Sequence, residues 1–170
     1  PPPDSAREYT SHILACTVVL RFITILKKWH SKLIFVRIAK RKKIYFQLIF
    51  EKMLVKEIKK YDLVVVSDYG HGLVTKKMAK FLCKNSKFLA LNAQANASSA
   101  GYHSIQKYKD VDCVVMNDSE LRYELRDKNE KIEILMKKLT NMIMIRNLIV
   151  TRGSSGAILY NSIKKKYFNC

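Results

Sequence analysis

The sequence predicts an α/β fold built around a mostly parallel sheet. Four short runs of β-branched and apolar residues are typical of strands that are buried on both faces. These runs are residues 62–67, 87–92, 112–116 and 147–151. Stretches with apolar residues at helical spacing lie between them, and this alternation indicates right-handed crossovers between parallel strands.

Two helices are predicted from a capping residue and from apolar spacing. Thr75 follows the first run, and its hydroxyl can accept a hydrogen bond from the first turn of a helix. The apolar positions are Met78, Ala79 and Leu82 in this helix, and Ile132, Leu135, Met136 and Leu139 in the later one. A short amphipathic piece surrounds Ile105 and Tyr108. Residues 157–160 and 166–168 are predicted to form an antiparallel pair.

The first 50 residues are less regular. Residues 33–38 and 44–50 are strand-like and are separated by a basic turn, so we expect a β-ribbon over 33–50. Residues 1–32 receive no assignment. The apolar run from His12 to Leu26 contains Arg21 and is too short to cross a bilayer, so no membrane segment is expected.

Composition fits a globular domain, or part of a larger one, of 170 residues with 48% apolar residues. The net charge of +18 raises the question of nucleic-acid binding, but the excess is spread along the chain and no nucleic-acid motif accompanies it. We therefore expect a generally basic surface. The four cysteines form no C-x-x-C pair, so neither a zinc site nor a redox motif is indicated, and a reduced, cytoplasmic location is expected.

Polar and glycine-rich residues follow each predicted strand. The clusters are residues 67–72, 92–101, 117–120 and 151–156. Ligands of parallel sheets bind beyond the carboxyl ends of the strands, so these clusters indicate a binding site independently of any family.

Three of these clusters have both a chemical and a purely structural interpretation. Asn117 and Glu120 can hold a hydrated Mg²⁺ near phosphates, or they can simply cap a helix. The segment 151–156 has the amides, hydroxyl and arginine that suit a phosphate chain, or it is a turn between strands. Asp68 can bind a sugar hydroxyl, or it can begin an Asx-type turn, and His71 is interpreted as an ordinary loop histidine.

Taken together and in this order, the three clusters resemble those of the ribokinase-type carbohydrate kinases of the PfkB family. The resemblance covers roughly residues 62–168. The stretch Ser67-Asp68-Tyr69-Gly70-x-Gly72 is most similar to the heptose-phosphate kinase domain of ADP-heptose synthase-like bifunctional proteins. The run from Asn92 to Ala97 resembles a branch in which such a domain accompanies a nucleotidyltransferase domain.

The resemblance implies a ribokinase-like three-layer sandwich, with the ribbon at 33–50 as part of a small β-lid and a partial kinase domain over 51–170. It implies ATP and Mg²⁺ as cofactors. The implied nucleotide-binding residues are Asn117, Thr151, Gly153 and Gly156, with Glu120 and Asn117 at the metal. The implied substrate-binding residues are Asp68, Tyr69, Gly70, Asn92 and Gln94.

Two departures from the family pattern limit this expectation. The family's Gly-Ala-Gly-Asp segment, which contains the base that activates the sugar hydroxyl, does not occur in the sequence and is expected beyond Cys170. We therefore name no catalytic residue and expect the isolated chain to be inactive. Asn92-Ala93-Gln94 stands where heptose-phosphate kinases commonly have an Asp-Pro-Lys-like stretch, so the sugar remains open.

Three functions are weighed for this sequence. The first is a partial kinase domain that transfers a phosphoryl group from Mg-ATP to a sugar hydroxyl. The second is a non-catalytic nucleotide- or sugar-binding remnant of the same fold. The third, a nucleic-acid-binding protein, is disfavoured. Expected partners are a sugar or sugar phosphate, a nucleotide, a nucleotidyltransferase domain in the full-length protein and a second copy in a homodimer, without nucleic acid or membrane.

Overall fold

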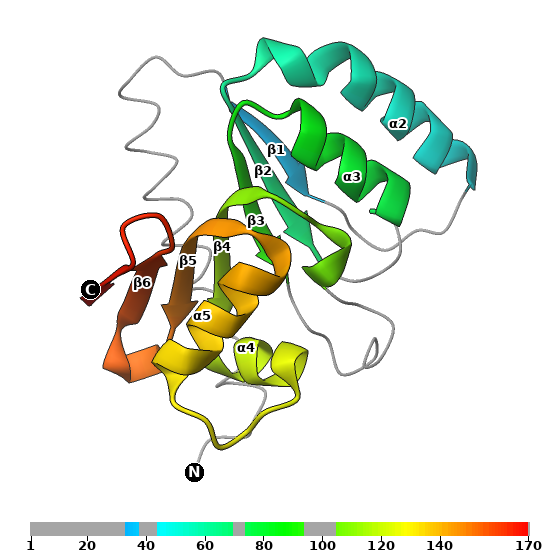
Figure 1. Cartoon of the computed structure of the whole chain (residues 1–170). Helices are drawn as coiled ribbons and strands as arrows, with labels where there is room; N and C mark the ends of the chain where they lie inside the picture. Colours follow the sequence, from blue (N-terminus) through cyan, green and yellow to red (C-terminus); the bar gives the residue numbers. More distant parts are fainter. Residues whose placement is uncertain (1–32, 38–43, 70–73, 94–104, 170) are drawn as a thin grey trace.

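A computed structural model describes residues 33–37, 44–69, 74–93 and 105–169, and it describes side chains from Glu51 onward. The described residues form one seven-stranded sheet whose strands lie in the order of the sequence (Figure 1). The strands are β1 (Leu33–Arg37), β2 (Leu63–Asp68), β3 (Leu89–Ala93), β4 (Val111–Asn117), β5 (Ile145–Thr151), β6 (Ala157–Asn161) and β7 (Lys166–Asn169). Strands β1 to β5 are parallel, and β6 and β7 are antiparallel. The predicted α/β fold, its four parallel strands and its antiparallel pair are confirmed.

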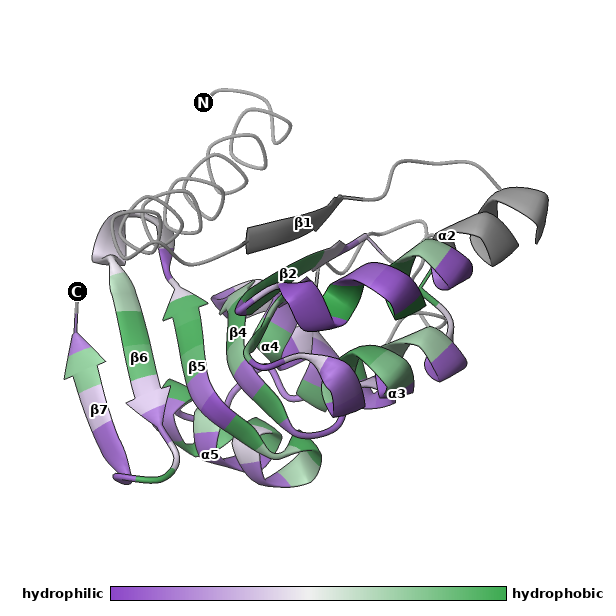
Figure 2. Cartoon of the chain, turned by 90° about the horizontal axis from the view of Figure 1, so that it is seen from above, coloured by the Kyte–Doolittle hydropathy of each residue, from purple (hydrophilic) through white to green (hydrophobic). Residues whose placement is uncertain are grey.

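Helical segments connect the parallel strands. They are α2 (Ile44–Glu57), η1 (Ile58–Lys60), α3 (Lys76–Asn85), η3 (Ile105–Lys107), α4 (Asp118–Leu125) and α5 (Ile132–Ile143), with η4 (Gly153–Ser155) between β5 and β6. Right-handed crossovers between strands that advance in one direction place their helices on the same face of a sheet. Helices α2 to α5 accordingly lie on one face of the sheet (Figure 2). Their side chains share one hydrophobic core with that face.

The two predicted helices begin and pack as expected. Thr75 is the N-cap of α3, and its Oγ1 accepts a hydrogen bond from the backbone N–H of Met78 at 3.1 Å. The three predicted apolar positions of α3 are buried, and so are the four predicted positions of α5. Met144 caps the C-terminus of α5 and has a left-handed backbone with φ of 55°.

The predicted β-ribbon over residues 33–50 is wrong. Residues 33–37 form β1 of the main sheet and pair in parallel with β2, while residues 44–57 form helix α2. A short apolar run does not distinguish a strand from a buried helix by periodicity alone, and here the run continues as a helix past Phe50 to Glu57. The described part of the main sheet therefore begins at Leu33, before the predicted domain boundary at residue 51.

The two faces of the sheet carry separate apolar clusters. The larger cluster joins the helices to alternate residues of the strands, such as Val64, Leu91 and Leu148. The residues between them form a smaller cluster on the second face, composed of Leu63, Val65, Ala90, Cys113 and Val115. This alternation follows from the period of two in a strand, and its apolar character on both faces is typical of a parallel sheet. Burial raises the pKa of the Cys113 thiol to about 12.

A network at the amino-terminal ends of the strands fixes their register. The carboxylate of Asp112 accepts a hydrogen bond from the backbone N–H of Leu89 at 2.8 Å and forms an ion pair with Arg146. Asn147 donates to the carbonyl of Asp112 at 3.0 Å, and Asn161 donates to the Asn147 side chain at 2.7 Å. Strands β3 to β6 are thus linked by side chains at the edge opposite the polar clusters.

Among the described helices, none is long and apolar enough to cross a membrane.

Candidate functional site

The predicted site residues that the structure describes lie along one edge of the sheet. Asp68 and Thr151 end β2 and β5, Asn117 ends β4, and Asn92 lies one residue before the end of β3. The strand registers place Ser67 beside Asn92 and Asn117 beside Thr151. The sequence prediction of a common carboxyl edge is confirmed for these residues. Gly70, His71 and Gln94 lie outside the described residues.

Asn117 and Glu120 form a capping box at the start of α4. The Oδ1 atom of Asn117 accepts a hydrogen bond from the backbone N–H of Glu120 at 2.7 Å, and the Glu120 carboxylate accepts one from the backbone N–H of Asn117 at 2.8 Å. The structural interpretation of this pair is therefore correct. It also holds an amide and a carboxylate at a helix N-terminus, where the backbone dipoles favour negative charge.

A tight turn follows Thr151, which is buried at the end of β5. The Arg152 amide donates to the carbonyl of Gly156 at 2.8 Å, and the Ser155 amide donates to the carbonyl of Arg152 at 3.1 Å. Gly153 and Gly156 have φ of 58° and 75°, a region that disfavours other residues. A β-carbon at Gly153 would meet no atom within 4 Å, so its backbone lies beside open space. The turn is both a strand connection and an open glycine-rich surface beside Asn117.

Asp68 lies in a buried polar cluster that the sequence did not reveal. Its Oδ2 atom is 2.5 Å from the Lys107 ammonium and accepts a hydrogen bond from the Tyr108 hydroxyl at 2.8 Å. Asp68 and Tyr108 are 3% and 0% exposed. Asp68 lies about 40 positions from the other two residues, and only the packing of η3 beside β2 brings them together. The amphipathic pattern around Tyr108 predicted that this segment packs against the rest of the domain, but it did not indicate Asp68 as the partner of Tyr108.

Tyr108 gives the chain a pH dependence that can be measured. Burial raises the pKa of Tyr108 far above its usual range, and the Asp68 carboxylate beside it raises it further. A group with a raised folded-state pKa contributes stability below its unfolded pKa of about 10, and this contribution is lost as the pH rises above that value. We expect the unmodified chain to lose about 1 kcal/mol more than a Tyr108→Phe variant between pH 10 and 11. Urea unfolding of both proteins at several pH values tests this, and parallel pH profiles would contradict it.

Comparison with known proteins points to one group. No family model matches the chain. It is 29% identical over 108 residues to the bifunctional protein HldE of Campylobacter jejuni strain RM1221, a match that covers 62% of this chain and 23% of that protein. The bifunctional protein HldE of Desulfatibacillum aliphaticivorans is 27% identical over 109 residues, which are 62% of this chain and 22% of the relative.

Solved structures give the same fold. Escherichia coli phosphofructokinase-2, in complex with fructose-6-phosphate, superposes with a TM-score of 0.52 and 14% identity over 70% of this chain and 41% of that one. Arabidopsis thaliana ribokinase, complexed with ribose and ATP, gives a TM-score of 0.51 and 15% identity over 68% of this chain and 36% of that one. The chain has the ribokinase-like fold of the PfkB-type carbohydrate kinases. The resemblance that its sequence predicted is confirmed.

The ribokinase-like fold accounts for the position of the site but is only partly represented. The chain spans about a quarter of the length of the HldE proteins that it matches. Among the described residues, no group of three or more histidine, cysteine, aspartate or glutamate side chains could hold a metal ion.

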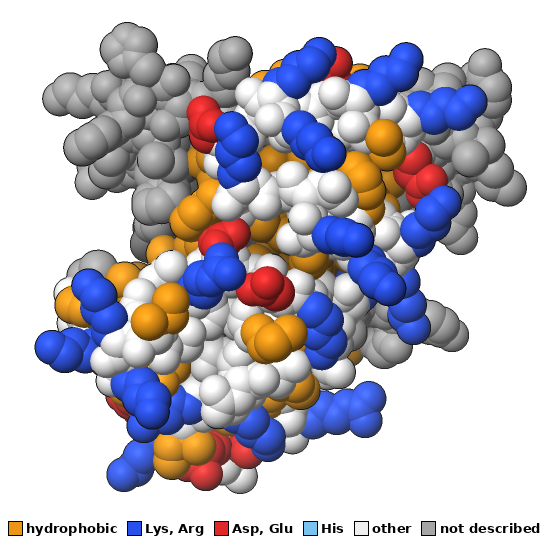
Figure 3. Space-filling view, turned by 45° about the horizontal axis from the view of Figure 1, so that its top comes forward, with side chains coloured by type: hydrophobic (Ala, Val, Ile, Leu, Met, Phe, Trp, Pro, Cys, Tyr) orange, Lys and Arg blue, Asp and Glu red, His pale blue; other side chains and the backbone are white. Residues whose placement is uncertain are grey.

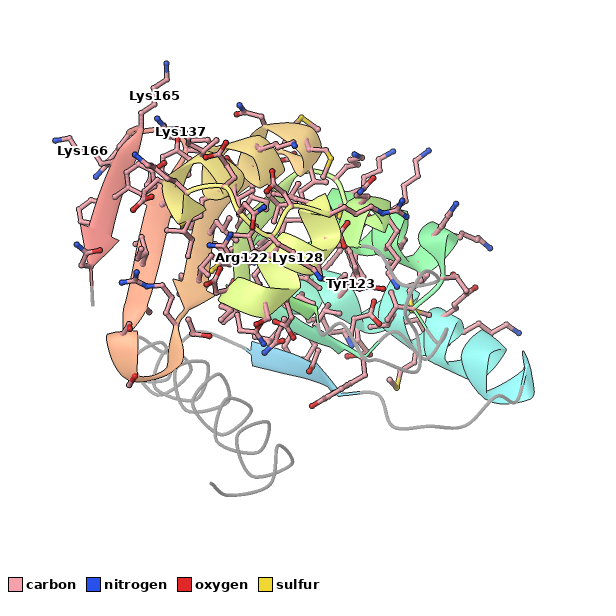
Figure 4. The ribbon with its side chains drawn as sticks, turned by 90° about the horizontal axis from the view of Figure 1, so that it is seen from below. Arg122, Tyr123, Lys128, Lys137, Lys165 and Lys166 are labelled. Carbon is pink, nitrogen blue, oxygen red and sulfur yellow. The ribbon has the colours of Figure 1, made fainter. Side chains whose placement is uncertain are left out.

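Basic side chains are spread over the ribokinase-like domain. On the face in Figure 3 they lie among acidic and apolar side chains and do not form one stripe. Figure 4 labels Arg122 beside Lys128, and Arg122 donates to the carbonyl of Lys128 at 3.0 Å. Lys137 lies over the ring of Tyr167, with 5.8 Å between its ammonium and the ring centroid. Arg122 and Lys137 therefore stabilise a turn and the β7 edge.

Proposed function

We propose that the chain is part of an ATP-dependent sugar kinase domain that transfers a phosphoryl group to a hydroxyl of a sugar or sugar phosphate. The main observation is the adjacency of Asn117 and Thr151 at the carboxyl edge, between the N-terminus of α4 and an open glycine turn. Amides at a helix N-terminus and in such a turn suit a polyanion. ATP in the related ribokinase structure supports the choice of nucleotide.

In this proposal the chain's own residues position the nucleotide. Asn117 and the first turn of α4 face the phosphates, and the 151–156 turn borders the nucleotide. Phosphoryl transfer depends mainly on positioning and on neutralising charge, which suits a site made of amides and few carboxylates. Mg²⁺ commonly binds through one or two carboxylates together with substrate phosphates and water, so Glu120 alone fits a magnesium ion that arrives with ATP. When bound, that ion would neutralise phosphate charge.

The sugar side of the proposed site is the neighbouring part of the edge. Asp68, Tyr69 and Asn92 are the described residues that we assign to it. The similarity to HldE favours a heptose phosphate as substrate, and the word bifunctional in that name fits a nucleotidyltransferase domain as a partner in a longer protein. A cytoplasmic location and a homodimer belong to the same proposal.

A non-catalytic binding remnant is the second candidate. It is favoured by the capping box, because the carboxylate of Glu120 already has a structural partner in the backbone N–H of Asn117. The absence of activity in the isolated chain stays a prediction. The kinase requires nucleotide binding and the remnant binds a nucleotide or a sugar, so nucleotide binding is the first property to test.

The decisive measurement is calorimetric titration of the chain with ATP and MgCl₂. Asn117→Asp keeps a good N-cap but adds a negative charge where the phosphates are placed. We expect it to weaken Mg-ATP binding about tenfold or more with little change in thermal stability, because like charges repel strongly at a partly buried site. Asn141→Asp on the exposed face of α5 makes the same charge change and should leave binding unchanged. Equal affinity in the Asn117→Asp and unmodified chains would refute the proposed nucleotide site.

A further inference from the structure

Lys107 joins three segments at the edge that carries the proposed site. Its ammonium lies 2.5 Å from Asp68 Oδ2 at the end of β2, and it donates to the carbonyl of Val74, just before α3, at 2.9 Å. The lysine itself belongs to η3. Its side chain is 12% exposed and that of Asp68 is 3% exposed, so this is a buried ion pair. A buried charge is tolerated when it is paired and hydrogen-bonded.

The pair has a defined geometry. Lys107 and Tyr108 both contact the same oxygen, Oδ2 of Asp68, and they come from one turn of chain. That turn is itself held on α4, since Glu124 accepts hydrogen bonds from the Ile105 amide at 3.4 Å and from the Gln106 side chain at 3.1 Å. Two donors on one oxygen fix the plane of the Asp68 carboxylate. Because the turn that carries these donors is anchored on α4, the position of the carboxylate is linked to the helix that begins after Asn117.

The charge of the pair bears on the kind of ligand that the site accepts. A carboxylate alone at this edge would repel the phosphates of a nucleotide and of a sugar phosphate, and the repulsion is strong where water is excluded. The Lys107 ammonium cancels that charge and, together with the Tyr108 hydroxyl, holds the carboxylate in one orientation. The arrangement therefore makes an acidic residue at the proposed sugar site compatible with anionic substrates.

We propose that Lys107 and Tyr108 are positioning residues for the sugar side of the site, and that they act through Asp68 to make it suitable for a phosphorylated sugar. This inference rests on the proposed function and deepens it. Lys107 neutralises and orients the carboxylate, and Tyr108 fixes the same oxygen. Removing the lysine should therefore weaken the binding of a sugar phosphate more than the binding of the same sugar without its phosphate.

The test is NMR titration of the 170-residue chain with heptose 7-phosphate and with the unphosphorylated heptose, in the unmodified protein and in four variants. The variants are Lys107→Met, Lys107→Arg, Asp68→Asn and the double change of Lys107→Met with Asp68→Asn. We expect Lys107→Met to weaken the binding of heptose 7-phosphate about tenfold and the binding of heptose only about two- to threefold. Lys107→Arg should recover most of the affinity because it keeps the charge. The double variant has lost both charges, so its preference for heptose 7-phosphate over heptose should be close to that of the unmodified protein.

A purely structural lysine gives a different result. It would weaken the binding of both sugars equally, because a general loss of stability does not distinguish a phosphorylated sugar from an unphosphorylated one. That outcome, or unchanged sugar phosphate binding in Lys107→Met, would overturn the inference. If Lys107→Met does not fold, Asp68→Asn and the double variant decide the same question, because they differ only at residue 107 and the preference for sugar phosphate should be lower in the double variant. Mg-ATP titrated into the same samples tests the proposed function separately. If a variant still binds Mg-ATP but no longer prefers the sugar phosphate, the result concerns the role of Lys107 and not the proposed nucleotide site.

Discussion

Replacing Lys107 by methionine is expected to lower the free energy of unfolding by about 3–5 kcal/mol. The change removes the ammonium but keeps most of the apolar stem, and it leaves the Asp68 carboxylate buried at 3% exposure without its cation. Stripping one partner from a buried ion pair costs far more than the pair contributes as a whole, because the remaining charge lacks both water and compensation. Urea unfolding followed by circular dichroism measures the effect.

Two comparison variants make this prediction specific. Adding Asp68→Asn to Lys107→Met removes the second charge, so most of the lost stability should return. Lys80→Met makes the same substitution at an exposed position of α3 and should change the free energy of unfolding by less than about 0.5 kcal/mol. A Lys107→Met protein as stable as the Lys80→Met protein would mean that Asp68 is not confined to this pair.

The second large effect is expected at the packing of α5 on the sheet. Leu139 is 0% exposed and belongs to the larger apolar cluster together with Leu148 of β5. Leu139→Ala should lower the free energy of unfolding by about 2–5 kcal/mol, through lost burial and through the cavity that remains. Alanine is a good helix former, so the loss reports on packing and not on helix propensity.

The same helix supplies the control. Ile134 lies on the outer side of α5 and is 48% exposed, so Ile134→Ala should cost less than about 1 kcal/mol. Thermal or urea unfolding of both variants measures the difference between the two positions. Similar losses at Leu139 and Ile134 would contradict the assignment of one buried and one exposed face to α5.

Local patterns predicted most of the fold because they report on local physics. Each buried strand is an uninterrupted apolar run, and Thr75 caps α3 through an atom only three residues away. The polar residues at the strand ends were correctly placed on one edge because parallel strands share an edge at their carboxyl ends. The strand prediction for residues 44–50 was wrong, because an apolar stretch of that length fits a strand and a helix equally well.

The contacts of the candidate site were harder to predict because they join distant parts of the chain. Asp68 was recognised by its place after a strand, but its partners in and beside η3 lie about 40 residues away and depend on the path of the crossover. The roles assigned to Asn117, Glu120, Thr151 and the glycines stay predictions, since the same capping box and turn also serve the fold. Geometry locates these residues, and only ligand binding distinguishes the two uses.

The order of the strands also bears on how the sheet is made. Each strand from β2 to β6 pairs only with the strand before it and the strand after it in the sequence. Every pairing therefore joins strands that follow one another in the sequence, and no described strand pairs with one much later in the chain. A chain emerging from the ribosome can add each strand to an existing edge as soon as it is synthesised, without waiting for a distant partner. Assembly of this sheet is thus suited to proceed in the direction of translation.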